Sequence, residues 1–247
     1  MKKPNLNEDF PEIVICYPNP ERNTCKERLK QLEKLGVERI LSEGRVQLGK
    51  FKVLGKGCTS VVVKALYRGR KVVLKIRRTD SDRKDLLREA MILKEVNKYG
   101  IGPKLLDYTK DILVMEHIDG ISIGEWIMQV EDQHFFKEVL KKLLDMLFLM
   151  DTLGICHLEL ARPKNHIIVS GNRPVILDFE TISTKTKKSN LTQVLAFLLY
   201  RDSAITGKVL KLLKIKDLER LKMLLRKYKK NRCKNTYLDI LKAMNLA

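Results

Sequence analysis

Polar and apolar residues alternate over short runs in the first half of the chain, and a period of two predicts β-strands. Five such runs are bounded by glycine, proline or charged turn residues: Val46–Leu54, Ser60–Leu66, Lys71–Ile76, Lys104–Tyr108 and Asp111–Met115. Between the third and fourth runs, apolar residues recur at helical spacing from about Asp82 to Tyr99. The pattern therefore predicts an antiparallel meander of three strands, one helix and two more strands.

The residues before this meander have a pattern of their own. Glu12–Tyr17 is a short apolar run that predicts a strand, and Pro18 ends it. Thr24 and Glu27 then have capping-box spacing, and leucines follow at helical spacing until Gly36. A strand and a helix are too few to bury a core of their own. We therefore expect residues 1–45 to pack on the sheet that follows.

After Gly120 the pattern becomes mainly helical. Six segments have helical periodicity or lie in the basic end of the chain: Ile123–Val130, Phe135–Leu153, Leu191–Tyr200, Lys208–Leu213, Asp217–Lys230 and Thr236–Leu246. Two short apolar strands, His166–Val169 and Pro174–Leu177, flank a Gly-Asn turn. The fold class predicted is α+β, with an antiparallel-sheet lobe at 46–118, a mainly helical lobe at 119–247 and an N-terminal extension at 1–45.

Charge is distributed unevenly along this pattern. The chain has 49 Lys and Arg against 30 Asp and Glu, a net charge of +19. Residues 181–247 hold 17 of the basic and 4 of the acidic residues, which leaves +13 there. Such a field attracts polyanions, although a solvated helical face would have the same composition. We expect the basic residues of 208–234 to be a docking surface for RNA, a ribosomal or tRNA-modification complex, or an acidic protein. Tyr228 and Tyr237 are the only aromatic residues nearby, so base stacking should be minor.

The five cysteines are scattered, with no pair at CxxC spacing: Cys16, Cys25, Cys58, Cys156 and Cys233. This favours reduced thiols in a cytoplasmic protein over a disulfide framework or a zinc site. The most apolar stretch, Val139–Met150, is interrupted by three charged residues and is too short to span a bilayer. We expect no membrane partner.

Three features of the first half suggest phosphate chemistry. Gly55-Lys56-Gly57-Cys58-Thr59-Ser60 is a glycine-rich turn between two strands, where backbone N–H groups can surround a phosphate. Lys75 ends the apolar strand Val72-Val73-Leu74-Lys75, and an inward lysine needs an anionic partner. Glu89, on the helix that follows, can supply it. Taken singly, each of these features also fits an ordinary turn or an ordinary surface residue.

Three further motifs follow in order: VMEHIDG at Val114–Gly120, HLELARPKN at His157–Asn165 and ILDFE at Ile176–Glu180. Asp178 follows an apolar strand and is placed to hold a divalent cation. In this order and spacing, the six motifs resemble the signature set of the protein-kinase superfamily over about residues 46–200. The resemblance implies a bilobal fold that uses ATP and Mg²⁺.

The departures from the usual pattern narrow the resemblance. Ser60 replaces the third glycine of the loop, and Glu180 replaces the glycine of DFG. Asn190 comes only twelve positions after Asp178, and no APE motif follows, so there is no room for a full activation segment. The chain is in this respect similar to the compact atypical kinases: the RIO kinases, the small kinase of the tRNA-threonylcarbamoylation complex and the predicted archaeal serine/threonine kinases.

The resemblance implies roles for particular residues. The catalytic set is Lys75, Glu89, Glu159, Asn165 and Asp178, with Asn165 and Asp178 as metal ligands. The nucleotide-binding set is Gly55, Lys56, Gly57, Cys58, Thr59, Ser60, Val62, Val73, Lys75, Met115, Glu116 and Ile118. Glu159 stands where the family has its catalytic aspartate. Counting forward from Glu159 puts Lys164 at the family's metal-binding asparagine, and counting back from Ile167 puts His166 there. His157 is expected to be structural.

The function that the resemblance implies is that of an atypical ATP-dependent serine/threonine protein kinase, with autophosphorylation or ATPase activity included. Its partners would be ATP and a protein substrate. Two alternatives stay open at this point. One is an ATP-responsive RNA- or ribonucleoprotein-binding factor with weak or no kinase activity, which the altered catalytic loop and the basic end of the chain would suit. The other is a small-molecule kinase.

Overall fold

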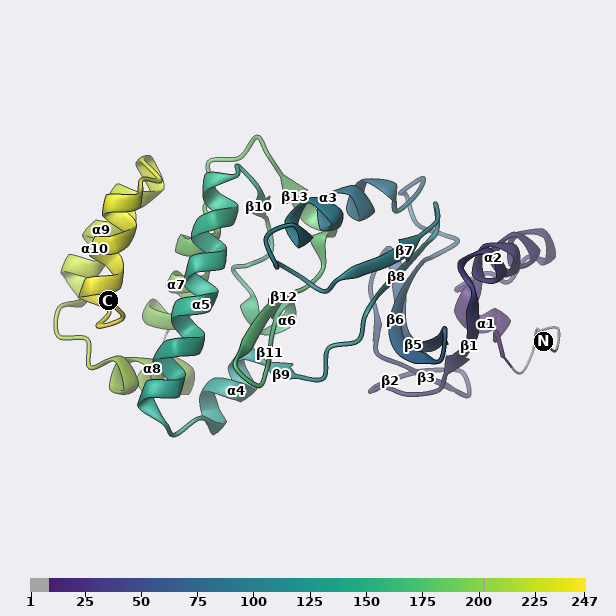
Figure 1. Ribbon diagram of the computed structural model, residues 1–247, viewed down its shortest axis with the longest axis horizontal. Coiled ribbons are helices and arrows are strands. Elements are labelled where there is room, and N and C mark those ends of the chain that lie inside the picture. The colour runs from purple at the N-terminus through teal and green to yellow at the C-terminus, as the bar shows by residue number, and fades with distance from the viewer. Residues whose placement is uncertain (1–8, 202) are drawn as a thin grey trace. The chain divides into compact units, whose positions relative to one another are not determined.

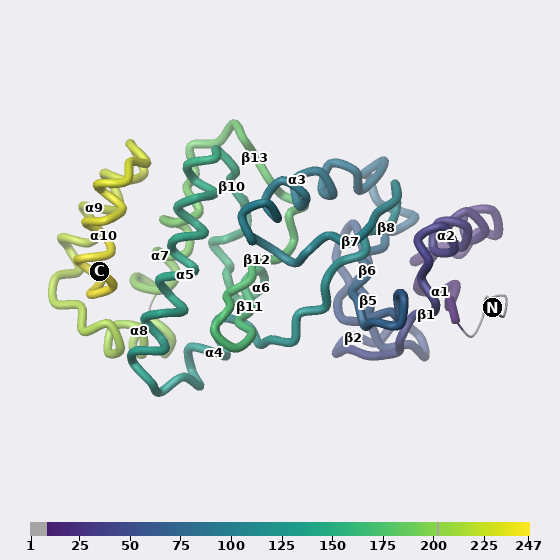
Figure 2. Tube along the Cα trace, in the orientation of Figure 1, coloured from purple at the N-terminus to yellow at the C-terminus, as the bar shows by residue number. Residues whose placement is uncertain are grey.

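The computed structural model describes residues 9–201 and 203–247, which form helices and antiparallel sheets of the α+β class (Figure 1). The chain separates into two compact units, one that ends at Ile118 and one from Asp119 to Ala247 (Figure 2). Among the described residues, no helix combines the length and the hydropathy needed to cross a membrane.

The first unit is built on an antiparallel sheet with the order β1-β5-β6-β8-β7, in which β4 also pairs with β5. Its strands are β1 (Val37–Leu41), β4 (Gly55–Lys56), β5 (Ser60–Tyr67), β6 (Arg70–Arg77), β7 (Leu105–Tyr108) and β8 (Ile112–Glu116). Four of the five predicted strand runs are confirmed. The fifth, Val46–Leu54, is wrong as one strand: it is a hairpin of β2 (Val46–Leu48) and β3 (Phe51–Val53), because the chain turns at Gly49 with φ of +61°.

The two faces of this sheet have different partners. On one face, alternate residues of β5 and β6, such as Val63 and Leu74, are fully buried in a core with Phe10, Ile15 and Leu32 of the N-terminal segment. The expected packing on the sheet is therefore confirmed for residues 9–45, and residues 1–8 lie outside the described part of the chain. The opposite face is met by α3 (Leu87–Asn97), whose Glu89 bonds to Lys75 of β6. The predicted helix begins later than expected, since residues 82–86 have no regular secondary structure.

The local structure of the N-terminal segment differs from the sequence prediction. Glu12–Tyr17 is not a strand, because Glu12–Ile15 forms the single-turn helix α1, and an apolar run this short does not distinguish the two. The predicted capping box at Thr24 is also wrong. Helix α2 (Arg22–Leu35) begins before it, with Glu21 as an N-cap that makes no side-chain cap bond. The predicted end at Gly36 is confirmed, with φ of +76°.

Cys16 and Cys25 form a disulfide that links the residue after α1 to α2. The expectation of reduced thiols is therefore wrong for this pair. The Cα atoms lie 5.6 Å apart because the chain reverses between the two short helices, which a spacing of nine residues does not reveal. The other three cysteines are free thiols: Cys58 is exposed, Cys233 is half-buried and Cys156 is buried.

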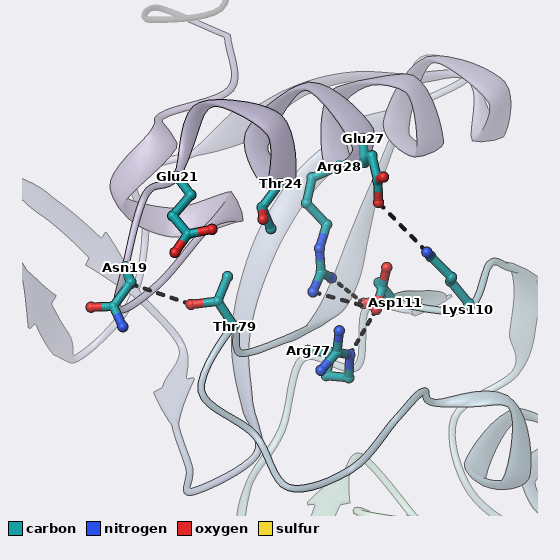
Figure 3. A pocket seen from close by; sticks show the side chains of 9 residues that line it. All are labelled: Asn19, Glu21, Thr24, Glu27, Arg28, Arg77, Thr79, Lys110 and Asp111. Carbon is teal, nitrogen blue, oxygen red and sulfur yellow. Dashed lines mark hydrogen bonds and ion pairs between the residues drawn. The ribbon is translucent and has the colours of Figure 1, made fainter.

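A buried charge cluster fastens α2 to the sheet (Figure 3). The Arg28 guanidinium donates to the backbone oxygen of Asp111, and Arg77 Nε donates to Asp111 Oδ1 at 2.7 Å. Burial lowers the pKa of Arg28 to about 10. Burial alone would raise the pKa of Asp111, but a Gln31 hydrogen bond and the two arginines lower it overall. A polar cavity of about 230 Å³ lies beside this cluster.

The second unit is mainly helical, as the sequence predicts. Its helices are α4 (Ile123–Gln129), α5 (Gln133–Thr152), α6 (Pro163–His166), α7 (Asn190–Tyr200), α8 (Ala204–Leu213), α9 (Leu218–Lys230) and α10 (Lys234–Ala243). The predicted hairpin is β11 (Ile167–Ser170) with β12 (Arg173–Ile176), and β9 (Ile121–Ser122) joins β11. A second small pair, β10 (Cys156–His157) with β13 (Ile182–Ser183), was not predicted.

Asp151, at the end of α5, is the buried centre of this unit. Its carboxylate accepts hydrogen bonds from Ser189 Oγ at 2.6 Å, from the Asn190 backbone N–H at 2.7 Å and from the Tyr228 hydroxyl at 3.2 Å. It thereby joins the start of α7 to α9. Burial raises the pKa of Asp151, although the donated hydrogen bonds work in the other direction.

We expect Asp151 to make the stability of this unit fall as pH rises above about 3.8, its ordinary pKa. Above that pH the folded state holds more protons than the unfolded state. The free energy of unfolding then falls by at most about 1.4 kcal/mol per pH unit for one such group. Asp151→Asn should lack this contribution. Denaturant unfolding followed by the single tryptophan, the buried Trp126 of α4, measures it. The difference in free energy of unfolding, wild type minus Asp151→Asn, should therefore fall as pH rises. A difference that rises with pH would contradict the prediction.

Candidate functional site

The glycine-rich turn of the first unit is closed by backbone hydrogen bonds. Gly55 and Lys56 pair with Val62 and Val61, and the Gly57 N–H donates to the Ser60 oxygen at 2.9 Å. Arg78 directly follows β6. Its side chain donates to the Gly57 backbone oxygen at 2.8 Å and also forms an ion pair with Asp80. Cys58 is exposed at the tip and Ser60 is buried at the base. Sequence reasoning did not find the role of Arg78, because it depends on the register of β6.

The fold itself does not demand glycine in this turn. Neither Gly55 nor Gly57 has a positive φ. A Cβ added at Gly55 would lie 4.0 Å from Val62, and one at Gly57 would lie 3.8 Å from the Ser60 oxygen, both ordinary contacts. Glycine here therefore leaves the backbone open to a close neighbour, which is how glycine-rich loops admit phosphates.

Four residues of the predicted nucleotide-binding set share one face of the sheet. Val62 is paired with Lys75, and Val73 is paired with Met115. Directly opposed residues project to the same face, as do residues two apart on a strand. The two valines, the methionine and the lysine therefore form one surface, on the side that α3 meets.

Lys75 and Glu89 form a buried ion pair on that face. Lys75 Nζ lies 2.8 Å from Glu89 Oε1, and each residue is only 4% exposed. Burying two opposite charges carries a large desolvation cost, so such pairs are weak evidence for stability and are often kept for another reason. The spacing along the sequence predicted this pair, and the structure brings the two residues together.

The last two residues of the nucleotide-binding set lie at the end of the first unit. Glu116 ends β8, where its backbone N–H donates to the Lys104 oxygen at 2.8 Å and its carboxylate accepts from the Lys104 N–H. Ile118 follows, in a segment without regular secondary structure. These contacts join the end of β8 to Lys104, the residue before β7.

In the second unit, His157 connects the two polar segments that the sequence singled out. It is fully buried, its Nε2 lies 3.1 Å from the Leu177 oxygen, and its Nδ1 accepts from the Glu159 N–H at 3.3 Å. A carbonyl oxygen only accepts, so Nε2 carries the proton. Burial lowers the pKa of His157, which keeps the ring neutral at pH 7. The ring therefore positions Glu159 and the residue before Asp178, in agreement with the structural role expected for it.

Glu159, His166 and Asp178 come together in this unit. One ligand atom from each lies within 4.8 Å of the others. His166 ends α6 and is 8% exposed, and its Nδ1 has no hydrogen-bond partner within the described residues. Two carboxylates and an imidazole suit a divalent cation. His166, one of the three candidates for the family's asparagine position, therefore lies beside Asp178 and Glu159.

Asp178 has a backbone conformation that L-residues rarely adopt. Its φ is +65° and its ψ is +73°, at the start of the 3₁₀ turn η1 (Phe179–Thr181). Left-handed conformations cost energy in residues other than glycine and concentrate at functional sites. In the same turn, the Thr181 hydroxyl donates to Glu159 Oε2 at 2.9 Å. No sequence signal pointed to Thr181, because the contact arises only when β10 and β13 pair.

The other candidates of the HLELARPKN and ILDFE motifs are placed differently. Asn165 lies on α6 with its side chain exposed, and that side chain makes no hydrogen bond among residues 9–201 and 203–247. Its role as a metal ligand stays a prediction. Lys164 packs its stem on Gly124, whose added Cβ would lie 3.0 Å from it, and its Nζ lies 5.9 Å from the centre of the Phe197 ring. Glu180 is half-buried in the η1 turn.

No protein-family model matches this chain, and no curated protein sequence matches it. Residue geometry within each unit is therefore what supports a functional assignment.

Proposed function

We propose that the chain is an atypical ATP-dependent kinase, which transfers the γ-phosphoryl group of ATP to a serine or threonine hydroxyl. The observation that carries this proposal is the buried Lys75–Glu89 pair on a sheet face with Val62, Val73 and Met115. A lysine held by a helix glutamate is the arrangement that positions the α- and β-phosphates in protein kinases. The apolar neighbours on the same face suit the adenine ring.

Several features support the kinase-like fold that this proposal includes. An antiparallel sheet carries the lysine on β6, the next helix carries the glutamate, and β7 and β8 follow. The second unit is mainly helical, and the hairpin β11–β12 separates the HLELARPKN and DFE motifs. This order is the one expected of a bilobal kinase.

The second unit supplies the acceptor side of the proposed reaction. Asp178 would hold Mg²⁺ through its carboxylate, the ligand type that Mg²⁺ prefers, and ligand atoms of Glu159 and His166 lie within 4.8 Å of it. Bound Mg²⁺ neutralises phosphate charge as it develops. Glu159 would accept the proton of the acceptor hydroxyl, while Thr181 and the His157-bound backbone keep its carboxylate in place.

Glu159→Gln tests the proton-accepting role. The substituted amide oxygen can still accept from Thr181, so the fold should be retained. General-base catalysis contributes about 100- to 10,000-fold, and phosphoryl transfer should fall by that factor. The readouts are autophosphorylation with labelled ATP and release of ADP. Glu131→Gln, at a carboxylate that is 85% exposed in the same unit, is the matched control. Undiminished turnover in Glu159→Gln, or no turnover in the wild type, would overturn the proposal.

A further inference from the structure

A hollow lies in the second unit, and none of the residues assigned above lines it. It has a volume of about 650 Å³ and is lined mainly by α7 and α9, together with Ala161 of the HLELARPKN motif. We call it the α7–α9 groove. Ala161 is two residues after Glu159, so the groove adjoins the proposed acceptor side of the same unit.

The α7–α9 groove is strongly basic. Five of its lining side chains are cations: Lys188, Arg201, Lys222, Arg226 and Lys229. Among the described residues, no acidic side chain lines it. Lys222 is near Glu219 at 3.4 Å, and the other four form no ion pair within the described part of the chain. Three of the cations follow each other at i, i+4 and i+7 along α9, which puts them on one face of the helix.

The floor of the groove is apolar and aromatic. Phe197 and Tyr200 project from α7, and Leu225 from α9. The Tyr200 hydroxyl donates to the Leu218 oxygen at 3.1 Å, which fixes a ring that is 38% exposed. Arg201 lies 5.5 Å from the centre of the Phe197 ring. By contrast, Tyr228 and Tyr237, the aromatic residues that the sequence places near the basic residues of 208–234, are buried at 0% and 4% exposure.

We propose that the α7–α9 groove binds a single-stranded segment of nucleic acid. Spaced cations that follow a backbone, combined with an exposed aromatic ring on which a base can stack, are the two components of single-strand recognition. An acidic peptide would satisfy the cations but would leave the aromatic floor without a matching π-face. A duplex keeps its bases stacked on one another, so it could not use the ring. The surplus of positive charge over residues 181–247 would steer such a polyanion to this unit. This inference does not depend on phosphoryl transfer.

Fluorescence anisotropy without nucleotide tests the proposal, with labelled oligouridine and oligothymidine of about 12 nucleotides, within the usual range of site sizes. Each phosphate contact contributes about −0.7 to the log–log salt slope on single strands, so the wild-type slope should be roughly −3. Arg226→Gln/Lys229→Gln should reduce the slope by about 1.4 and weaken binding at least about tenfold. Lys227→Gln/Lys230→Gln, on the same helix but outside the groove, is the matched control and should bind nearly as the wild type does.

The ring is tested separately. Tyr200→Ala should weaken binding about 5- to 100-fold, whereas Tyr200→Phe, which keeps the ring, should bind within about threefold of the wild type. Binding of either oligonucleotide supports the proposal, and a preference for the ribose strand identifies RNA as the ligand. The proposal is overturned if the control pair loses as much affinity as the groove pair. It is also overturned if polyglutamate competes as well as the oligonucleotides while Tyr200→Ala has no effect. Neither result would bear on ATP binding.

Discussion

Replacing Lys75 with methionine is expected to reduce phosphoryl transfer and to destabilise the first unit at the same time. Removing the charged hydrogen bonds to phosphate should cost about 1.5–3 kcal/mol each, or roughly 10- to 150-fold in rate. Glu89 would be left buried without its cation, and breaking a buried pair in this way costs about 3–5 kcal/mol of unfolding free energy. Labelled-phosphate transfer and calorimetric unfolding measure the two effects.

The double variant Lys75→Met/Glu89→Leu separates these effects. Replacing both charges by apolar side chains of similar size removes the uncompensated carboxylate, so most of the lost stability should return. Activity should not return, because the phosphate contact is still missing. Lys71→Met, on the same strand at a lysine whose side chain is 57% exposed, is the matched control and should change neither quantity appreciably. If the stable double variant were fully active, Lys75 would have no part in the chemistry.

Asp178→Asn is expected to reduce phosphoryl transfer strongly. Asparagine tolerates the left-handed backbone at this position, so the change removes a charge without adding strain. Metal-mediated stabilisation of transferred phosphate charge is worth several kcal/mol, which corresponds to roughly 1,000-fold in rate. Phosphoryl transfer measured against Mg²⁺ concentration checks it.

Asp178→Gly provides a second variant at the same position. Glycine relieves the strain of a positive φ, so thermal stability should be at least that of the wild type. Its activity should be as low as that of Asp178→Asn, because the carboxylate is missing in both. An active glycine variant would show that the backbone of this turn matters and the carboxylate does not.

The sequence predicted the larger elements well because their periodicity comes from one buried face. In β5, buried and half-buried residues alternate from Val61 to Tyr67, and such a pattern is visible without a fold. In β6 the alternation holds from Val72 to Leu74 and is interrupted by the buried Lys75. β1 was missed because Glu38 and Arg39 are adjacent and both exposed, and a register shift in its pairing interrupts the alternation. The helix α1 was mistaken for a strand because its four residues are too few to show either period.

The sequence could predict those site residues whose role follows from their position along a strand or a helix. Lys75 and Glu89 lie on consecutive elements, and their pairing follows from a resemblance in spacing. His166 and Thr181 could not be selected in this way, because their proximity to Glu159 depends on how α6 and the β10–β13 pair fold. The α7–α9 groove could not be predicted from the sequence either. The net charge indicated a basic surface, but only helix packing shows that Tyr200 is exposed and Tyr228 is not.

The most direct test of whether the chain binds ATP through Lys75 and Asp178 is thermal unfolding with and without ATP and Mg²⁺. At a ligand concentration of about 100 times Kd, binding adds about 2.7 kcal/mol. For a chain of this size that corresponds to a rise in Tm of roughly 5–11 °C. We expect this rise for the wild type and the loss of its Mg²⁺-dependent part in Asp178→Asn. A wild type whose Tm does not change with ATP and Mg²⁺, or an equal rise in Asp178→Asn, would contradict it.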